Sequence, residues 1–134
     1  MKLTRASTYA LHAVAFMASR KSDKPIASHK IARRRKIPDR FLLKVLKPLV
    51  SHDILVAFKG PSGGYQLARP ASQITMLQVI EAAENGPLRG GAPTNPRNPG
   101  SQLDKRLSQI CGKASDAMRE QLSKIKITEL ITRD

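Results

Sequence analysis

The alternation of apolar and polar positions divides the first third of the chain into short helices. In residues 4–19, small and apolar side chains recur at steps of three and four, which predicts a helix with Thr4 as its N-cap. A polar break follows, and residues 28–36 predict a second helix with Ser28 as a possible cap. This helix is expected to end before Pro38, because the residue preceding a proline avoids the helical region.

Residues 27–50 carry the most informative pattern. On a helix that begins near Pro38, one face would hold the apolar side chains Phe41, Leu42, Val45, Leu46, Leu49 and Val50. The opposite face would hold Asp39, Arg40, Lys44 and Lys47. A short helix, a turn and a helix that is apolar behind and basic in front are typical of a helix-turn-helix DNA reader. On this stretch alone, a helical hairpin with a solvated basic face is an equal alternative.

Pro48 interrupts the apolar face of this predicted helix. An interior proline removes one backbone hydrogen bond and crowds the carbonyl four residues earlier, at a cost of about 3 kcal/mol. We therefore expect a kink, or a helix that ends near Lys47 and is shorter than its apolar face suggests.

A pair of strands is predicted directly after the helix-turn-helix pattern. Residues 54–59 are β-branched and apolar, and residues 63–68 read as the return strand. The turn Gly60-Pro61-Ser62-Gly63 between them supplies residues suited to a tight reversal. A helix-turn-helix followed by a hairpin is a winged helix. Residues 75–84 then predict a further helix with Thr75 as its N-cap.

The second half of the chain combines a patternless segment with a long helix. Residues 86–102 contain four Pro and four Gly without periodicity, which predicts a flexible loop. The helix that follows keeps an apolar seam over about 24 residues, or roughly 36 Å. The seam consists of Leu103, Leu107, Ile110, Cys111, Ala114, Met118, Leu122 and Ile125.

A domain of this size cannot cover the whole seam. We therefore expect the helix to pair with a second copy of the chain, with the seam as the dimer interface. Packing across its own domain is the alternative. Residues 127–131 are apolar enough to dock back on the body.

Charge separates the two halves. The net charge is +14, and residues 1–70 hold fifteen Lys/Arg against three Asp/Glu, whereas residues 71–134 hold nine against seven. The balance of +12 in the first half against +2 in the second indicates a polyanion-binding part joined to a part with another role. A merely soluble basic protein and a membrane-surface protein are the weaker alternatives.

Several classes of protein are not expected. The single cysteine excludes a disulfide within the chain and a cysteine-based metal site. No apolar run approaches the roughly 18 residues of a membrane span, and the N-terminus lacks a signal-peptide pattern, so we expect a cytoplasmic protein with no membrane partner. Paired carboxylates, a nucleophile–base pair and a phosphate-binding loop are missing from the pattern, so we do not expect an enzyme.

Several motifs together resemble the Rrf2 family of bacterial winged-helix transcription regulators. They are the opening MKLTRASTYALHAVAFMA, the stretch IPDRFL at 37–42, the wing KGPSGGYQLARP at 59–70, the segment ITMLQVIEA at 74–82 and residues 125–130. The resemblance implies a mostly α fold with a small β-hairpin. Residues 1–85 would form the winged helix-turn-helix DNA-binding domain, 86–102 a flexible loop, and 103–134 a dimerisation helix and tail.

The same resemblance implies a homodimeric repressor that binds a near-palindromic operator in double-stranded DNA. The helix from Pro38 would enter the major groove, where Arg40 and Lys44 could reach base edges or phosphates, and the wing would reach toward the minor groove. The expected DNA-binding residues are Lys2, Thr4, Arg5, Ser28, Arg33, Arg34, Arg35, Pro38, Asp39, Arg40, Phe41, Lys44, Lys47, Lys59, Gly60, Pro61, Ser62 and Gly63. A non-specific nucleic-acid-binding protein is the alternative.

The chain departs from the family in its loop. Many relatives carry cysteines there that ligate an iron–sulfur cluster, whereas residues 86–102 contain none. Cys111 lies within the seam, about two turns beyond the position where the last of those cysteines would fall, and we expect it to be a buried small hydrophobic side chain rather than a redox or metal-binding one. We therefore expect no cluster, no other cofactor and no metal. A partner protein or a small-molecule effector stays open as the source of regulation.

Overall fold

The computed structural model describes residues 2–88 and 94–132. Its helices are α1 (Arg5–Ser19), α2 (Ser28–Arg35), α3 (Asp39–Ser51), α4 (Met76–Ala83) and α5 (Gln102–Ser123). Two strands, β1 (Leu55–Phe58) and β2 (Gly64–Leu67), pair antiparallel, and the short 3-10 turns are η1 (Ala71–Gln73) and η2 (Ile127–Leu130). The predicted mostly α fold with one hairpin is confirmed.

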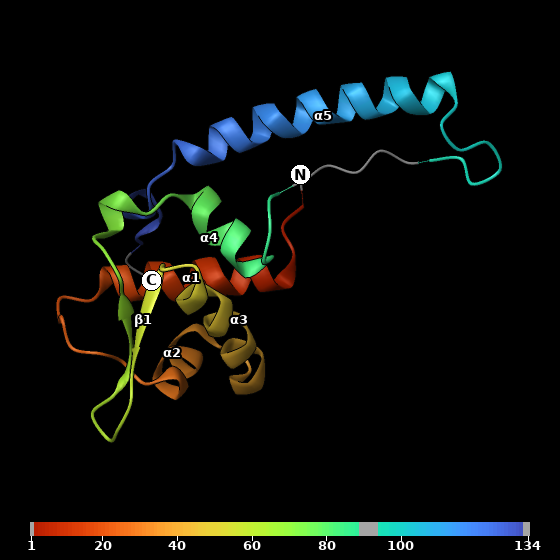
Figure 1. The fold of residues 1–134 in the computed structure, drawn as a ribbon. Helices are drawn as coiled ribbons and strands as arrows, with labels where there is room; N and C mark the ends of the chain where they lie inside the picture. The colour runs from red at the N-terminus through yellow and green to blue at the C-terminus, as the bar shows by residue number, and fades with distance from the viewer. Residues whose placement is uncertain (1, 89–93, 133–134) are drawn as a thin grey trace.

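The molecule consists of a body and an arm (Figure 1). Helices α1 to α4 pack around one another, and the hairpin projects from this body beside α2. Helix α5 runs along the opposite side and extends well past the body. The expected loop includes residues 89–93, which lie outside the described ones; the described residues of 86–101 contain no helix or strand.

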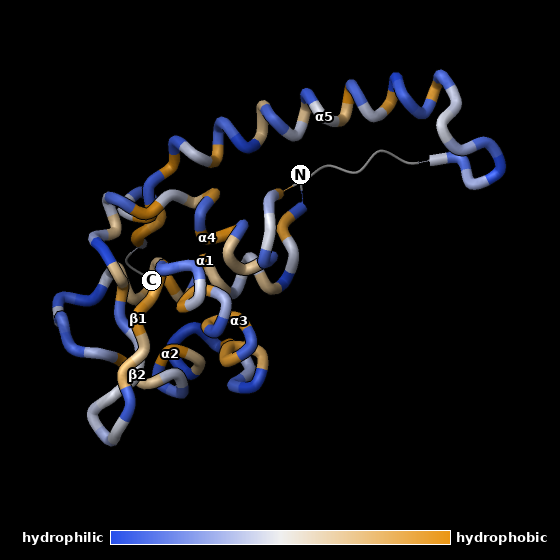
Figure 2. Tube along the Cα trace, viewed as in Figure 1, coloured by the Kyte–Doolittle hydropathy of each residue, from blue (hydrophilic) through white to orange (hydrophobic). Residues whose placement is uncertain are grey.

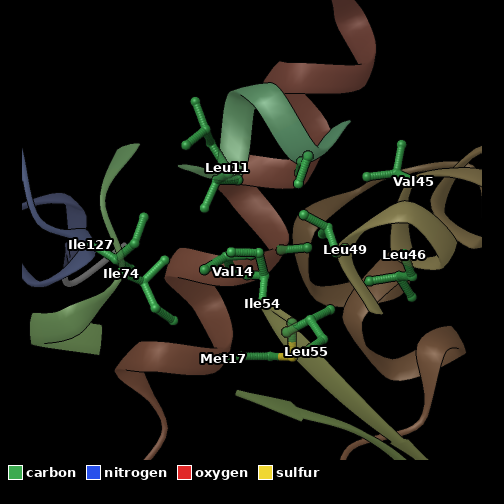
Figure 3. Close-up of a cluster of buried hydrophobic side chains, with 14 of the residues drawn as sticks. Leu11, Val14, Met17, Val45, Leu46, Leu49, Ile54, Leu55, Ile74 and Ile127 are labelled. Atoms are coloured by element: carbon green, nitrogen blue, oxygen red, sulfur yellow. The ribbon is translucent and has the colours of Figure 1, made fainter. Parts of the chain in front are cut away.

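The core of the body is aliphatic and draws on every helix within it. Figure 3 shows part of this core. Apolar faces of α1 and α3 meet the first residues of the hairpin and the segment before α4. The side chains of Val14, Leu46, Leu49, Ile54, Leu55 and Ile74 are all at most 2% exposed. The periodic apolar positions of the sequence therefore become the buried faces of one shared core.

Capping residues fix where two of the helices begin. Thr4 accepts a 3.1 Å hydrogen bond from the Ser7 N–H, and Thr75 forms a capping box with Gln78. Both predicted caps are confirmed. The suggested cap at Ser28 is wrong: Ser28 is already helical, and Ala27 holds the N-cap position without a side-chain hydrogen bond.

Helix α3 does not end near Lys47, so the expectation of an early end is wrong, whereas the alternative of a kink at Pro48 stays a prediction. The helix contains Pro48 and continues to Ser51. The reason is packing, because Leu49 is fully buried in the core and holds the last turn in place. The Pro48 carbonyl still accepts a 3.0 Å bond from the His52 N–H, so the proline removes a donor and leaves its acceptor in use.

The C-terminal segment docks on the body as predicted. The Met76 N–H donates to the Ile125 carbonyl at 2.8 Å, and the Ile127 N–H donates to the Ile74 carbonyl at 2.9 Å. Ile127 itself is fully buried. These contacts fix the C-terminal end of α5 to the body and leave its N-terminal end extended.

Candidate nucleic-acid interface

One face of α3 is exposed and basic. The buried side chains of α3 are Leu42, Val45, Leu46 and Leu49, and they lie on the other face of the helix. Steps of three and four residues bring the exposed ones into a single stripe, which we call the reading stripe and which consists of Arg40, Leu43, Lys44 and Lys47. Arg40 and Lys44 therefore face outward, as the sequence predicted.

Leu43 is the member of this stripe that sequence reasoning missed. Its side chain is 49% exposed on an otherwise charged surface. The signal was present in the sequence, because Leu43 falls outside the periodic apolar face of its helix. An exposed apolar residue among cations can contact the methyl group of a thymine in the major groove.

The turn between α2 and α3 fixes the angle at which α3 is presented. Lys36 caps α2 in the left-handed conformation, with φ 56° and ψ 47°. The Ile37 N–H then bonds back to the Ala32 carbonyl at 2.9 Å, and the Ile37 side chain is buried. Pro38 follows in extended geometry as the N-cap of α3. Such a short, pinned turn is typical of a helix-turn-helix.

The cluster of three arginines on α2 is divided between two environments. Arg33 and Arg34 are exposed to solvent, and Arg35 is half-buried. The Arg34 guanidinium lies 5.6 Å from the centre of the Phe16 ring, and Arg35 Nη2 lies 2.9 Å from Nδ1 of His12. Arg34 and Arg35 thus contact side chains of α1, and the expectation that all three arginines meet DNA phosphates stays a prediction.

Two other expected DNA contacts have roles within the fold. Phe41 is half-buried and meets Tyr9 edge to face, with ring centres 5.2 Å apart, so it anchors α3 on α1. Thr4 caps α1 and donates to Glu84, which also accepts a 2.8 Å bond from Ser7. These contacts fasten the start of α1 to the end of α4.

The hairpin is held beside the start of α2. Ile26 and Tyr65 exchange two backbone hydrogen bonds of 2.9 and 2.8 Å, which adds a bridge to the edge of β2. Gly64 permits this approach, because a Cβ there would lie 2.3 Å from the Ile26 carbonyl oxygen and its φ is +140°. The tip of the wing is exposed from Lys59 to Ser62, and the Gly63 N–H closes the turn onto the Gly60 carbonyl at 3.0 Å.

Arg69, at the end of the wing motif, serves the fold. Its guanidinium donates to the carbonyl oxygens of Asp53 and Gln73 and to Oε1 of Gln78, at 2.8, 3.1 and 3.0 Å. It thereby joins the residue before the hairpin to η1 and α4. The tip of the wing, α2 and α3 all lie at the end of the body opposite α5 (Figure 1).

The predicted seam of α5 is covered unevenly. Leu103 and Ile110 are 66% and 58% exposed, while Leu122 is 5% exposed and packs into the body's own core. Ala114 is exposed, and Leu107, Cys111, Met118 and Ile125 are half-buried. The expectation of a buried Cys111 is therefore not met within one chain. The exposed part of the seam lies on the section of α5 that extends past the body.

A charged contact joins α5 to α4. Arg119 donates to Glu81 through Nε at 3.0 Å and Nη2 at 3.2 Å, and the Leu88 N–H donates to the same carboxylate at 2.7 Å. Burial raises the pKa of Glu81, but the hydrogen bonds from Arg119 and Leu88 and the Arg119 charge outweigh it, so the pKa lies below its ordinary value.

Among the described residues, no helix is both long and apolar enough to cross a membrane. In that same part of the chain, no group of three or more His, Cys, Asp or Glu side chains is arranged to hold a metal ion.

The model of the Rrf2 family, described as an iron-dependent transcriptional regulator, matches residues 3–133. The chain belongs to the Rrf2 family. The members of this family are DNA-binding transcription regulators with a winged helix. The family match confirms the resemblance that the sequence motifs indicated.

The relatives differ in how much of them the chain spans. Protein rrf2 of Nitratidesulfovibrio vulgaris is 29% identical over 133 residues, which cover 98% of this chain and 87% of that protein. A putative HTH-type transcriptional regulator of Synechocystis is 38% identical over 63% of this chain and 57% of its own length. NsrR of Oceanobacillus iheyensis is 36% identical, over 63% and 58%. The chain spans little more than half the length of these last two relatives.

Solved structures share the fold across nearly the whole chain. CymR, described as the global cysteine regulator of B. subtilis, superimposes with a TM-score of 0.76 at 20% identity, over 97% of this chain and 95% of its own. IscR of T. potens gives a TM-score of 0.73 at 20% identity, over 97% and 85%. The winged-helix body with a long C-terminal helix is thus the shared architecture.

The residues of this chain do not fit the iron dependence in the family description. The segment 86–102 contains no Cys, His, Asp or Glu, and the one cysteine lies on α5. One thiolate cannot ligate an iron–sulfur cluster, which is held by several cysteines.

Proposed function

We propose that this Rrf2 regulator is a sequence-specific repressor that binds a near-palindromic operator as a homodimer, in the cytoplasm and without an iron–sulfur cluster. The observation that carries the proposal is the reading stripe on α3, at the same end of the body as the wing. A stripe with exposed cations on a pinned helix fits the major groove, about 12 Å wide.

Sequence would be read by the stripe itself. Arg40 and Lys44, one helical turn apart, reach base edges or phosphates, and Leu43 contacts a thymine methyl group. Lys47 lies one turn beyond Lys44 and contacts the backbone. A lone apolar contact between two cations favours a site in which a thymine neighbours a guanine.

Register would be set by contacts to phosphate. Lys2, Arg5 and Arg33 are exposed cations outside the stripe. The wing would bring Lys59 to the neighbouring groove. Such contacts position the protein without carrying sequence information. They also make the affinity steeply salt-dependent, because each neutralised phosphate releases counterions.

A second copy of the chain would supply the symmetry of the operator. The exposed apolar side chains of α5, above all Leu103 and Ile110, are the surface that pairing would cover. Repression requires only that the dimer occupy a site that overlaps a promoter. In this proposal the body binds the DNA and α5 forms the dimer.

The alternative is a protein that binds nucleic acid without sequence preference, which the net charge of +14 alone would support. Selection of duplexes from a random library separates the two. We expect enriched sites with two related half-sites, spaced by about one helical turn or a multiple of it. If no sequence is enriched over bulk DNA, the proposal of sequence-specific binding is wrong.

The Arg40→Ala variant tests the reading stripe on the selected site. It should weaken specific binding by about 1–3 kcal/mol and leave dimerisation unchanged, because Arg40 lies far from α5. Lys105→Ala, which removes an exposed cation from α5, is the matched control and should keep specific affinity. Unchanged affinity in Arg40→Ala would remove Arg40 from the readout.

A further inference from the structure

The wing carries two exposed apolar side chains on one face of β1. Val56 and Phe58 are 38% and 44% exposed. Because side chains alternate along a strand, both lie on the face opposite Leu55, which is buried in the core. Phe58 pairs in register with Gly64, so β2 has no side chain directly opposite the ring. The phenyl ring is therefore uncovered at the point where the strand meets the tip of the wing.

Exposed large apolar side chains are concentrated on a few elements. Two lie on α5, one lies in the C-terminal segment, and the other three lie on α3 and on β1, the elements proposed to contact DNA. Among the described residues, this class consists of Leu43, Val56, Phe58, Leu103, Ile110 and Ile131. An exposed apolar side chain that lies beside polar and charged ones marks a candidate interaction surface.

The surroundings of Phe58 favour DNA as the partner of this surface. The next residue, Lys59, is an exposed cation, and the wing tip lies at the same end of the body as α3 (Figure 1). A cation directly beside an apolar ring matches a surface with anionic rims and less polar walls. The minor groove is such a surface, since phosphates line its edges and deoxyriboses form its walls, and apolar side chains are used there by other proteins.

We propose that Phe58 enters the minor groove with the tip of the wing and packs against the deoxyribose wall, while Lys59 meets the phosphates at the rim. The contact adds affinity by burial of the ring and involves no charge. Val56 lies two residues nearer the body, about 7 Å along the strand, and stays outside a groove that is about 7.5 Å deep. The proposal rests on the proposed function, because it requires the wing to reach DNA.

Salt dependence separates the two contacts. Removal of one phosphate contact lowers the slope of the logarithm of affinity against the logarithm of salt concentration by about 0.9. Removal of an apolar contact lowers the affinity at every salt concentration and leaves that slope unchanged. A displaced wing would lose both contacts and would therefore show both effects.

Fluorescence anisotropy titrations of the full chain test this, with the selected duplex and with a random-sequence duplex, each over a series of salt concentrations. Phe58→Ala should bind at least fivefold more weakly with the slope of wild type, whereas Lys59→Ala should show the reduced slope. Unchanged affinity in Phe58→Ala overturns the proposal. A loss that comes with the slope of Lys59→Ala shows a displaced wing and also overturns it.

Matched variants locate the contact at Phe58. Val56→Ala removes a side chain of similar exposure from the same face and should bind within twofold of wild type. Phe58→Leu keeps an apolar side chain and should recover most of the affinity that Phe58→Ala loses. Thermal melts check that each variant keeps its fold. An equal loss in Val56→Ala, or no recovery in Phe58→Leu, overturns the proposal.

Two further outcomes separate this contact from its alternatives. Phe58→Ala should sediment as wild type, and weakened self-association would show that a second copy covers the ring, which overturns the proposal. If wild type selects no sequence, the proposed function fails, but the random-sequence duplex still decides the contact, since a deoxyribose contact carries no sequence information. If a sequence is selected and Phe58→Ala binds it as wild type does, only the contact of Phe58 is wrong.

Discussion

The body and α5 carry the same kind of amphipathic pattern but bury it differently. In the body, Leu46 is fully buried by side chains of its own chain, whereas Ile110 on α5 is 58% exposed. Figure 2 shows apolar positions recurring along α5 where the helix stands away from the body. Periodicity therefore identifies an apolar face, and only the arrangement of the other elements decides what covers that face.

The largest effect is expected from a substitution in the core of the body. Leu46→Ala leaves a cavity in the core and should lower the free energy of unfolding by about 2–5 kcal/mol. Urea denaturation, followed by circular dichroism at low protein concentration, measures this loss. Ile110→Ala is the matched control and should change the unfolding free energy of the body little, because its side chain is exposed. Equal losses in both variants would remove the distinction between the two regions.

Substitution of two glycines by alanine should change the stability of the protein in opposite directions. Gly64→Ala should destabilise the body by about 1–3 kcal/mol, because its φ is positive and the new Cβ meets the Ile26 carbonyl. Gly112→Ala on α5 meets nothing within 4 Å and should stabilise the helix by about 0.5–1 kcal/mol. Thermal melts of both variants beside wild type test the pair. A stable Gly64→Ala would mean that the hairpin can separate from Ile26 without cost.

Pairing through α5 is tested by a charge on its exposed face. Ile110→Glu should weaken self-association at least tenfold, which corresponds to about 1.4 kcal/mol, and leave the fold of the body unchanged. Sedimentation equilibrium measures the association. Gln109→Glu places the same carboxylate on the neighbouring exposed residue outside the seam and should associate as wild type. If Ile110→Glu pairs normally, the seam is not the interface.

The smallest expected effect concerns the contact between the two regions. Because the pKa of Glu81 is lowered in the folded state, its contact with Arg119 stabilises the fold above the ordinary Glu pKa, about 4.3, and this contribution is lost as the pH falls through the folded value. Glu81→Gln should therefore melt below wild type at pH 7, by a small margin because the pair is partly exposed, and the difference should vanish in acid.

Glu120→Gln is the matched control for that measurement. Glu120 pairs with Lys124 on the surface of α5, with both side chains more than 60% exposed, so its removal should leave the melting temperature unchanged at either pH. A difference between Glu81→Gln and wild type that persists at low pH would show that the carboxylate charge is not the cause.

Local signals in the sequence were sufficient to predict most of the fold. Caps such as Thr4 and Thr75, the three- and four-residue periods and the turn at 60–63 all act over a few residues. One error occurred where packing overrode a local rule, at Pro48, where the burial of Leu49 holds the helix beyond the proline.

Long-range contacts left no comparable signal. Nothing near Arg69 in the sequence indicates that it bonds Asp53, and nothing near Arg34 indicates that it faces Phe16. The reading stripe was predictable except for Leu43, because its position follows from periodicity alone. The roles of the stripe and of the wing on DNA stay predictions.

Lys36 shows a compromise between conformational ease and charge. A left-handed backbone costs a non-glycine residue about 1–2 kcal/mol, and glycine would occupy the same turn without that cost. A glycine would also remove a cation at the entry to α3. At such a position the residue present is not the one that the backbone conformation favours. Selection for stability alone should therefore replace Lys36 early, and the loss of its charge would weaken binding to polyanions.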